Sequence, residues 1–109
     1  MANSYKFKGV ALATTSETSL LTSANNETLI IKSIRITNNT SNTPTISMDV
    51  LDSSQSNTEF TILHTQSLSA NTSIELLSQP LVLESNDVLK ATISSTDSVH
   101  IGLNYLSVT

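Results

Sequence analysis

The chain of 109 residues contains no cysteine, which excludes several kinds of chemistry at the outset. Without cysteine there is no disulfide framework, no thiolate nucleophile and no zinc–cysteine site. Glycine and proline occur only twice each, so the chain is not a low-complexity linker. Aromatic residues are equally scarce, being limited to Tyr5, Phe7, Phe60 and Tyr105. The hydrophobic core must therefore be aliphatic.

Charge is also scarce, because charged residues make up 13% of the chain and give a net charge of −4. Five basic residues form no cluster able to bind a phosphate backbone, so we expect no nucleic-acid partner. The same deficit argues against an anionic membrane surface, and no apolar run approaches the roughly 20 residues of a membrane span. The first residues, Met1 to Lys8, lack the apolar core of a secretory signal. We expect synthesis in a cytoplasm and no membrane partner.

What the sequence does contain is an alternation of apolar and polar residues with period two, typical of strands with one buried face. The clearest run is Val99 to Tyr105, and shorter ones are Ile46 to Val50, Phe60 to Ile62 and Leu89 to Ile93. Within the run from Leu29 to Ile36 the apolar phase shifts by one residue. This shift predicts a β-bulge near Lys32 and Ser33, or burial on both faces.

Clusters of Asn, Asp and Ser separate these runs at a spacing of about ten residues. Asn tolerates the left-handed backbone conformation that glycine usually supplies, so Asn compensates for the lack of glycine in turns. The pattern predicts one all-β domain over residues 1–109, an antiparallel β-sandwich of seven or eight strands, immunoglobulin-like or jelly-roll-like. Ten residues are expected in the core: Ile34, Ile36, Met48, Val50, Phe60, Ile62, Leu89, Ile93, Ile101 and Leu103.

No catalytic or metal-binding pattern emerges from the polar residues. His64 continues the apolar phase of Phe60 and Ile62, so we place it at the edge of the core with a structural role. His100 should point outward, and neither histidine has a second one at ligand spacing. The acid pairs Asp49/Asp52 and Glu84/Asp87 flank turns, where carboxylates commonly cap the backbone. We expect no enzyme, no metal, no cofactor and no small-molecule substrate.

Three segments resemble small virion structural proteins of tailed bacteriophages, mainly marine ones. The first runs from Leu29 to Asn39 and continues with the Ile46–Ser54 stretch ISMDVLDSS. The second, LESNDVLK at residues 83–90, is similar to a family stretch LEAGDxLK, and the third, NYLSV at 104–108, to a closing SYLEI. Where the family has glycine-containing turns, this chain has Ser85-Asn86 and Leu68-Ser69-Ala70-Asn71, and Asn suits the same left-handed position.

The resemblance implies a non-enzymatic part of a phage particle, first a capsid decoration or cement protein and next a tail or baseplate accessory protein. Its partners would be identical subunits and the major capsid or tail protein, and its location the virion. A lectin-like or adhesive carbohydrate-binding module is the alternative. Sugar sites usually present aromatic platforms, and the exposed candidates here are limited to Tyr5, Phe7 and Tyr105.

The amino-terminal segment is the candidate interface. Tyr5 and Phe7 alternate with Lys6 and Lys8, so the aromatic side chains should share one face of a strand and the charges the other. Tyrosine and phenylalanine are enriched in the buried centres of interfaces. We expect residues 1–8 to form an interface strand or arm that contacts a partner chain in a homo-oligomer.

Overall fold

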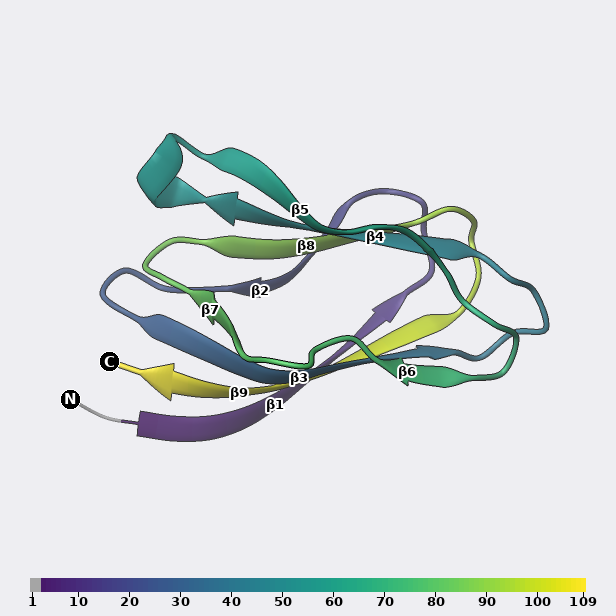
Figure 1. Ribbon diagram of the computed structural model, residues 1–109, viewed down its shortest axis with the longest axis horizontal. Helices are drawn as coiled ribbons and strands as arrows, with labels where there is room; N and C mark the ends of the chain where they lie inside the picture. The colour runs from purple at the N-terminus through teal and green to yellow at the C-terminus, as the bar shows by residue number, and fades with distance from the viewer. Residues whose placement is uncertain (1–2) are drawn as a thin grey trace.

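The computed structural model describes residues 3–109 as two antiparallel sheets packed face to face (Figure 1). The larger sheet has the strand order β1-β9-β3-β6, and β7 also pairs with β3. Its strands are β1 (Asn3–Leu12), β9 (Val99–Val108), β3 (Thr28–Asn38), β6 (Ser73–Glu75) and β7 (Leu81–Leu83). All pairings in it are antiparallel.

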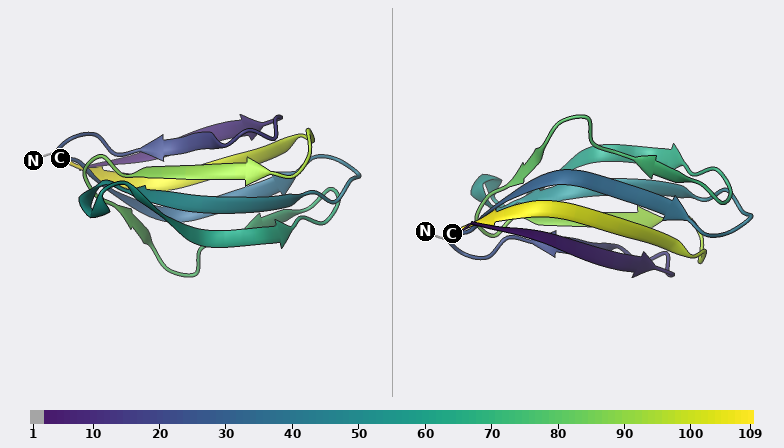
Figure 2. Two further views of the ribbon diagram at one scale, coloured as in Figure 1. Left: turned by 90° about the horizontal axis from the view of Figure 1, so that it is seen from above. Right: turned by 90° about the horizontal axis from the view of Figure 1, so that it is seen from below.

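The second sheet has four strands in the order β2-β8-β4-β5. Its strands are β2 (Thr18–Thr22), β8 (Val88–Ile93), β4 (Thr45–Asp52) and β5 (Thr58–Ser67), and a single 3₁₀ turn, η1 (Ser53–Gln55), joins β4 to β5. Most consecutive strands lie in opposite sheets, so the chain crosses the sandwich repeatedly and both termini reach the same end (Figure 2). The expected all-β antiparallel sandwich is confirmed.

Each alternating run of the sequence forms a strand, and the described residues hold nine strands where seven or eight were expected. The short strands β6 and β7 have three residues each, too few for a period-two pattern to be recognised. The phase shift in β3 is a bulge, since the register between β3 and β9 slips between Ile31 and Ser33. That prediction is confirmed.

The core between the sheets is aliphatic, as the scarcity of aromatic residues required. Its fully buried large side chains are Leu20, Leu29, Ile31, Ile34, Ile36, Ile46, Met48, Leu83, Leu89, Ile93, Ile101 and Leu103. Of the ten residues expected in the core, Val50 and Ile62 are only half-buried. Phe60 was placed wrongly, because its side chain is 45% exposed.

The error at Phe60 and a second one at His64 have a common origin in β5. This strand lies at the edge of its sheet, and its pairing with β4 is interrupted by two register shifts. Thr61 pairs with Asp49 and Leu63 with Met48, so the strict alternation assumed from the sequence is broken at Ile62. His64 is consequently exposed and does not lie at the edge of the core.

Asparagine supplies the left-handed turns, as the sequence indicated. Asn26, Asn57, Asn71 and Asn86 have φ between 54° and 68°, while neither glycine has a positive φ. Glycine in this chain therefore has a role other than backbone freedom.

Candidate functional site

Strand β1 carries the most exposed aromatic side chains of the described residues. Tyr5 is 75% exposed and Phe7 is 67% exposed. Their register partners on β9 are Leu106 and Asn104, so both side chains stand on the outer face of the five-stranded sheet. Residues 3–8 of the expected interface segment therefore belong to a paired strand, and Met1 and Ala2 lie outside the described residues.

Lys6 and Lys8 take the opposite face of β1, in phase with the inward-facing Val10 and Leu12. Because β1 is the edge strand of its sheet, both lysines are nevertheless exposed. Inward-pointing charges on an edge strand oppose pairing with the edge of another sheet. A partner that binds β1 is thus directed towards its aromatic face.

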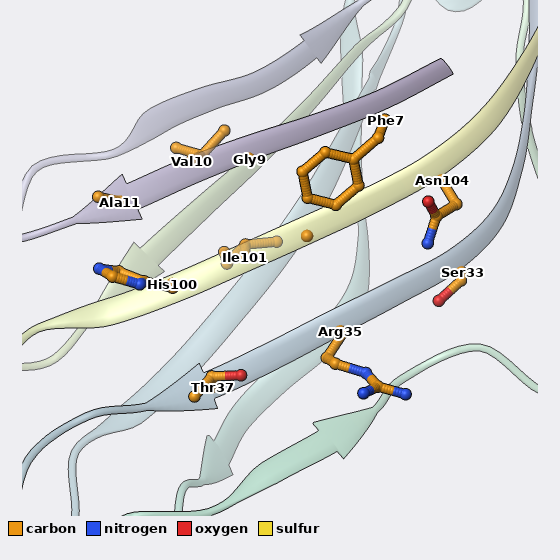
Figure 3. A pocket seen from close by; sticks show the side chains of 11 residues that line it. Phe7, Gly9, Val10, Ala11, Ser33, Arg35, Thr37, His100, Ile101 and Asn104 are labelled. Atoms are coloured by element: carbon orange, nitrogen blue, oxygen red, sulfur yellow. The ribbon is translucent and has the colours of Figure 1, made fainter. Parts of the chain in front are cut away.

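A groove with a volume of about 590 Å³ lies beside Phe7 on the outer face of β1, β9 and β3 (Figure 3). Ligand sites in proteins commonly have volumes of about 300–1,000 Å³. The Phe7 ring lies across β9 at one end of the groove, and Arg35 stands on β3 on the other side of that strand (Figure 3).

Both glycines of the chain form the floor of this groove. Gly9 on β1 is the direct register partner of Gly102 on β9. A Cβ atom added to Gly102 would stand 3.0 Å from Cε1 of Phe7, whereas one on Gly9 would stand at an ordinary contact distance of 3.5 Å. Since neither glycine has a positive φ, their common effect is to leave room above the backbone for the Phe7 ring and for an approaching group.

Several polar side chains that line the groove make no hydrogen bond or ion pair with other described residues. Arg35, His100 and Asn104 have no hydrogen-bond or ion-pair partner among residues 3–109. In contrast, the Ser33 hydroxyl donates to Glu75, and the hydroxyls of Thr37 and Ser73 are 2.7 Å apart. His100 is exposed, as expected for its outward phase.

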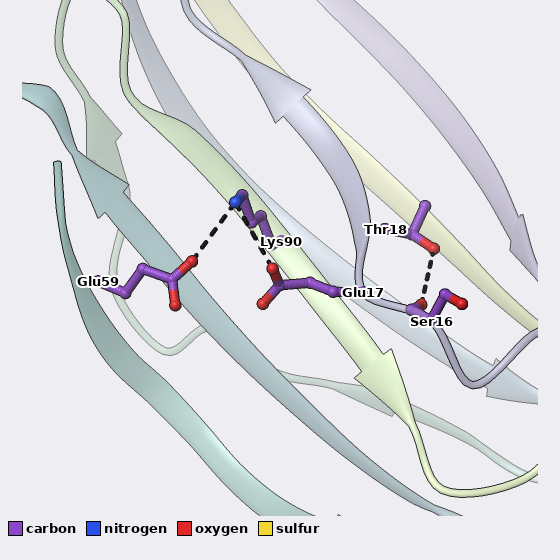
Figure 4. Close-up of polar contacts among 5 residues, drawn as sticks. All are labelled: Ser16, Glu17, Thr18, Glu59 and Lys90. Atoms are coloured by element: carbon purple, nitrogen blue, oxygen red, sulfur yellow. Dashed lines mark hydrogen bonds and ion pairs between the residues drawn. The ribbon is translucent and has the colours of Figure 1, made fainter.

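The outer face of the four-stranded sheet bears a different cluster, in which acids surround one lysine (Figure 4). Glu17, Asp49 and Glu59 bring carboxylate oxygens within 4.8 Å of one another. Lys90 Nζ stands 3.4 Å from a Glu59 oxygen and 3.5 Å from a Glu17 oxygen. The hydrogen bond with Glu59 raises the pKa of Lys90, and the nearby charges of Glu17 and Glu59 act in the same direction, while partial desolvation opposes them. The Lys90 ammonium group therefore already provides the positive charge that a metal ion would bring to Glu17 and Glu59.

Of the two acid pairs expected to cap turns, one member each binds backbone groups, Asp52 and Asp87. The Asp49 carboxylate lies in the acidic cluster instead, and the Glu84 side chain has no partner among residues 3–109. Asp52 caps η1 by accepting from the Ser54 backbone N–H at 3.0 Å. The buried Asp87 accepts from the backbone N–H groups of Ser53 and Glu84, at 3.0 and 2.9 Å. These contacts tie the β4–β5 turn to the β7–β8 turn.

Sequence reasoning missed Glu75, which completes the sheet at the β3 bulge. Strand β7 pairs with β3 up to Ile31 and β6 from Arg35 onward, so the intervening residues lack a partner strand on that side. The Glu75 carboxylate fills this gap by accepting from the Ile34 backbone N–H at 2.9 Å and from the Ser33 hydroxyl. Partial burial opposes ionisation, but hydrogen bonds from Ser33, Ile34 and Leu77, together with the nearby charge of Arg35, outweigh it and lower the pKa of Glu75. No sequence motif marks such a role.

Comparison with known proteins gives similarity of fold and nothing closer. No protein-family model matches the chain, and no curated protein matches it in sequence. The core domain of Drosophila NLP, described for pentamer formation and histone binding, has a TM-score of 0.56 at 16% identity, covering 94% of this chain and 98% of the other. Two structures of infectious bursal disease virus, one of the Gx strain and one of the T13 viral particle, have TM-scores of 0.60 and 0.58 at 10% and 9% identity.

The viral matches cover 96% of this chain but only 32% and 30% of the viral chains. At these identities the similarity establishes the β-sandwich fold alone. Viral particle proteins and an oligomer-forming protein are thus among the structures that share this architecture. No helix among residues 3–109 is long and apolar enough to cross a membrane.

Proposed function

We propose that the chain is a non-enzymatic structural protein of a bacteriophage particle, first a capsid decoration or cement protein and next a tail or baseplate accessory protein. The observation that carries the proposal is the exposed aromatic pair Tyr5 and Phe7 on edge strand β1. Large aromatic side chains exposed on a small domain are typical anchors of protein interfaces. The resemblance of three segments to phage virion proteins and the shared fold with viral particle proteins support it.

Self-association belongs to the same proposal. Tyr5 and Phe7 would be buried against an identical subunit or the major capsid or tail protein, while Lys6 and Lys8 prevent edge-to-edge addition of strands. The similar sandwich of the Drosophila NLP core, described for pentamer formation, is an example of this fold in a protein that self-associates. The location that follows is the virion.

The test is binding of purified protein to empty particles of the phage that encodes it. Deleting residues 1–8 would also remove most of a strand paired with β9, so the sharper variant is Tyr5→Ala. Val82→Ala is the matched control, because Val82 is 50% exposed on β7, in the same sheet as Tyr5 but away from β1. Tyr5→Ala should lower the occupancy of the particles and Val82→Ala should not. Full occupancy by Tyr5→Ala would contradict the proposal.

A second candidate, a lectin-like or adhesive carbohydrate-binding module, is favoured by one observation, the groove beside Phe7. Sugar-binding sites typically combine an exposed aromatic ring with polar side chains that are free to bind the sugar hydroxyl groups. Tyr105, considered from the sequence as a further platform, is half-buried and faces the core side of β9, so Phe7 stands alone at the groove.

A further inference from the structure

We infer that the groove beside Phe7 is a binding site for an acidic oligosaccharide, a chain of pyranose rings that carry carboxylates. This goes beyond the particle role and gives the second candidate function a ligand class. The inference depends on three features of the outer face of the five-stranded sheet: its floor, its unpaired polar groups and its charge.

The floor is shaped for a flat ring. Gly9 and Gly102 face each other at the only two glycine positions of the chain, and the Phe7 ring extends over both. The ring is 67% exposed, so one of its faces remains free for a ligand (Figure 3). The face of an aromatic ring is electron-rich and attracts the partly positive C–H groups on the apolar side of a pyranose.

The polar groups of the groove supply what a sugar needs besides a platform. Arg35 presents planar guanidinium donors, which match the two oxygens of a carboxylate. Asn104 and His100 each offer donors and acceptors for hydroxyl groups. None of the three side chains makes a hydrogen bond or an ion pair within residues 3–109, and the interaction of Arg35 with Glu75, its register partner, is through charge alone.

Charge selects an anionic ligand. None of the residues lining the groove is acidic, and the nearest acid in the sheet, Glu75, is already bound to Ser33, Ile34 and Leu77. Lys32 and Arg35 are exposed on β3 and make no ion pair among the described residues. Arg35 is the register partner of Glu75 and interacts with its charge, but the hydrogen bonds named above already occupy the Glu75 oxygens. A second copy placed with the same face against this one would bring Lys32 and Arg35 of the two copies together, which disfavours a symmetric dimer through the groove.

The test is calorimetric titration of the purified full chain with an oligogalacturonate. The comparison ligands are a neutral galacto-oligosaccharide of equal length and polyglutamate. We expect the oligogalacturonate to bind and both comparison ligands to bind at least about tenfold more weakly, which corresponds to about one well-placed charged contact. Equal binding of polyglutamate would mean unspecific attraction of polyanions and would overturn the inference, as would the absence of binding.

Two groove variants and two controls assign the site. Arg35→Gln removes the charge, and Phe7→Leu keeps apolar cover over the glycines but removes the aromatic face. Both should weaken oligogalacturonate binding by about tenfold, while thermal unfolding monitors their integrity. Lys90→Gln, on the opposite sheet, and Tyr5→Ala, the particle-binding variant, should bind sugar as the unsubstituted protein does.

The outcomes separate this inference from the particle role. If folded Arg35→Gln and Phe7→Leu retain full sugar affinity, the groove is not the site and the inference fails, whatever Tyr5→Ala does on particles. If sedimentation velocity shows that the unsubstituted protein is an oligomer and that Arg35→Gln is a monomer, the occupant of the groove is a second copy, and the saccharide assignment fails. Loss of particle binding by Tyr5→Ala with sugar binding intact is the expected combination.

Discussion

Replacing Glu75 tests whether one carboxylate completes the five-stranded sheet at the bulge of β3. In the native protein this carboxylate accepts from the Ile34 and Leu77 backbone N–H groups, at 2.9 and 3.2 Å, and from the Ser33 hydroxyl. Glu75→Ala leaves the partly buried Ile34 N–H group without its acceptor. Glu75→Gln keeps one acceptor oxygen but loses the charge and the second oxygen.

The size of the effect follows from these contacts. A hydrogen bond contributes about 0.5–1.5 kcal/mol net, and more when one partner is charged, but the Glu75 side chain is exposed and water replaces part of the loss. We expect Glu75→Ala to lower the free energy of unfolding by about 1–2 kcal/mol and Glu75→Gln by about half as much. In a domain of this size, each 1 kcal/mol lowers the melting temperature by about 4 °C.

The pH dependence has a defined sign. The pKa of Glu75 in the folded protein is lowered from its ordinary value of 4.5, so folding favours the ionised form. Its contribution to stability is therefore present above pH 4.5 and is lost as the pH falls through the lower folded pKa. The stability difference between native protein and Glu75→Gln should shrink over that acidic window, because Gln does not titrate.

The assay is equilibrium unfolding in urea followed by far-ultraviolet circular dichroism, with the slope against urea checked for constancy. Glu84→Ala is the matched control, because Glu84 is an exposed glutamate whose side chain has no partner among residues 3–109. It should change stability by less than about 0.5 kcal/mol. Equal effects of Glu75→Ala and Glu84→Ala, or a difference that grows on acidification, would refute the role assigned to Glu75.

Two further predictions concern the core and the acidic cluster. Ile34→Ala, at a fully buried position, should cost about 2–5 kcal/mol, whereas Phe60→Ala should cost about 1 kcal/mol or less because the side chain is 45% exposed; comparable losses in urea unfolding would contradict the burial seen for Phe60. Chelators should leave the melting temperature unchanged, since Lys90 already neutralises Glu17 and Glu59; a fall of several degrees with EDTA would reveal a bound cation.

The sequence was most informative where a strand has one buried face throughout. Ile34, Ile101 and Leu103 were assigned to the core from alternation alone, and the bulge at Lys32–Ser33 was visible as a phase shift. Alternation failed in β5, because register shifts on an edge strand leave no trace in the residue pattern. Phe60 and His64 were misplaced for this reason.

The candidate site was predictable only in its local part. The alternation of Tyr5 and Phe7 with Lys6 and Lys8 is a property of consecutive residues, and the strand register reproduces it. The groove depends on cross-strand contacts between residues more than sixty positions apart, such as Phe7 with Gly102. A single sequence does not contain that pairing.

The two outer faces of the sandwich differ in whether their charges are already satisfied. On the four-stranded sheet Lys90 is bound by Glu17 and Glu59, so that face makes its ion pairs internally. On the five-stranded sheet Arg35 makes no ion pair among the described residues and interacts with Glu75 through charge alone, and the exposed Phe7 ring lines the same groove. Unpaired charge and exposed aromatic surface both gain free energy from a bound partner, whereas satisfied ion pairs must first be broken. The binding surface of this protein is therefore to be sought on β1, β9 and β3, and variants of that face should affect binding while variants around Lys90 should not.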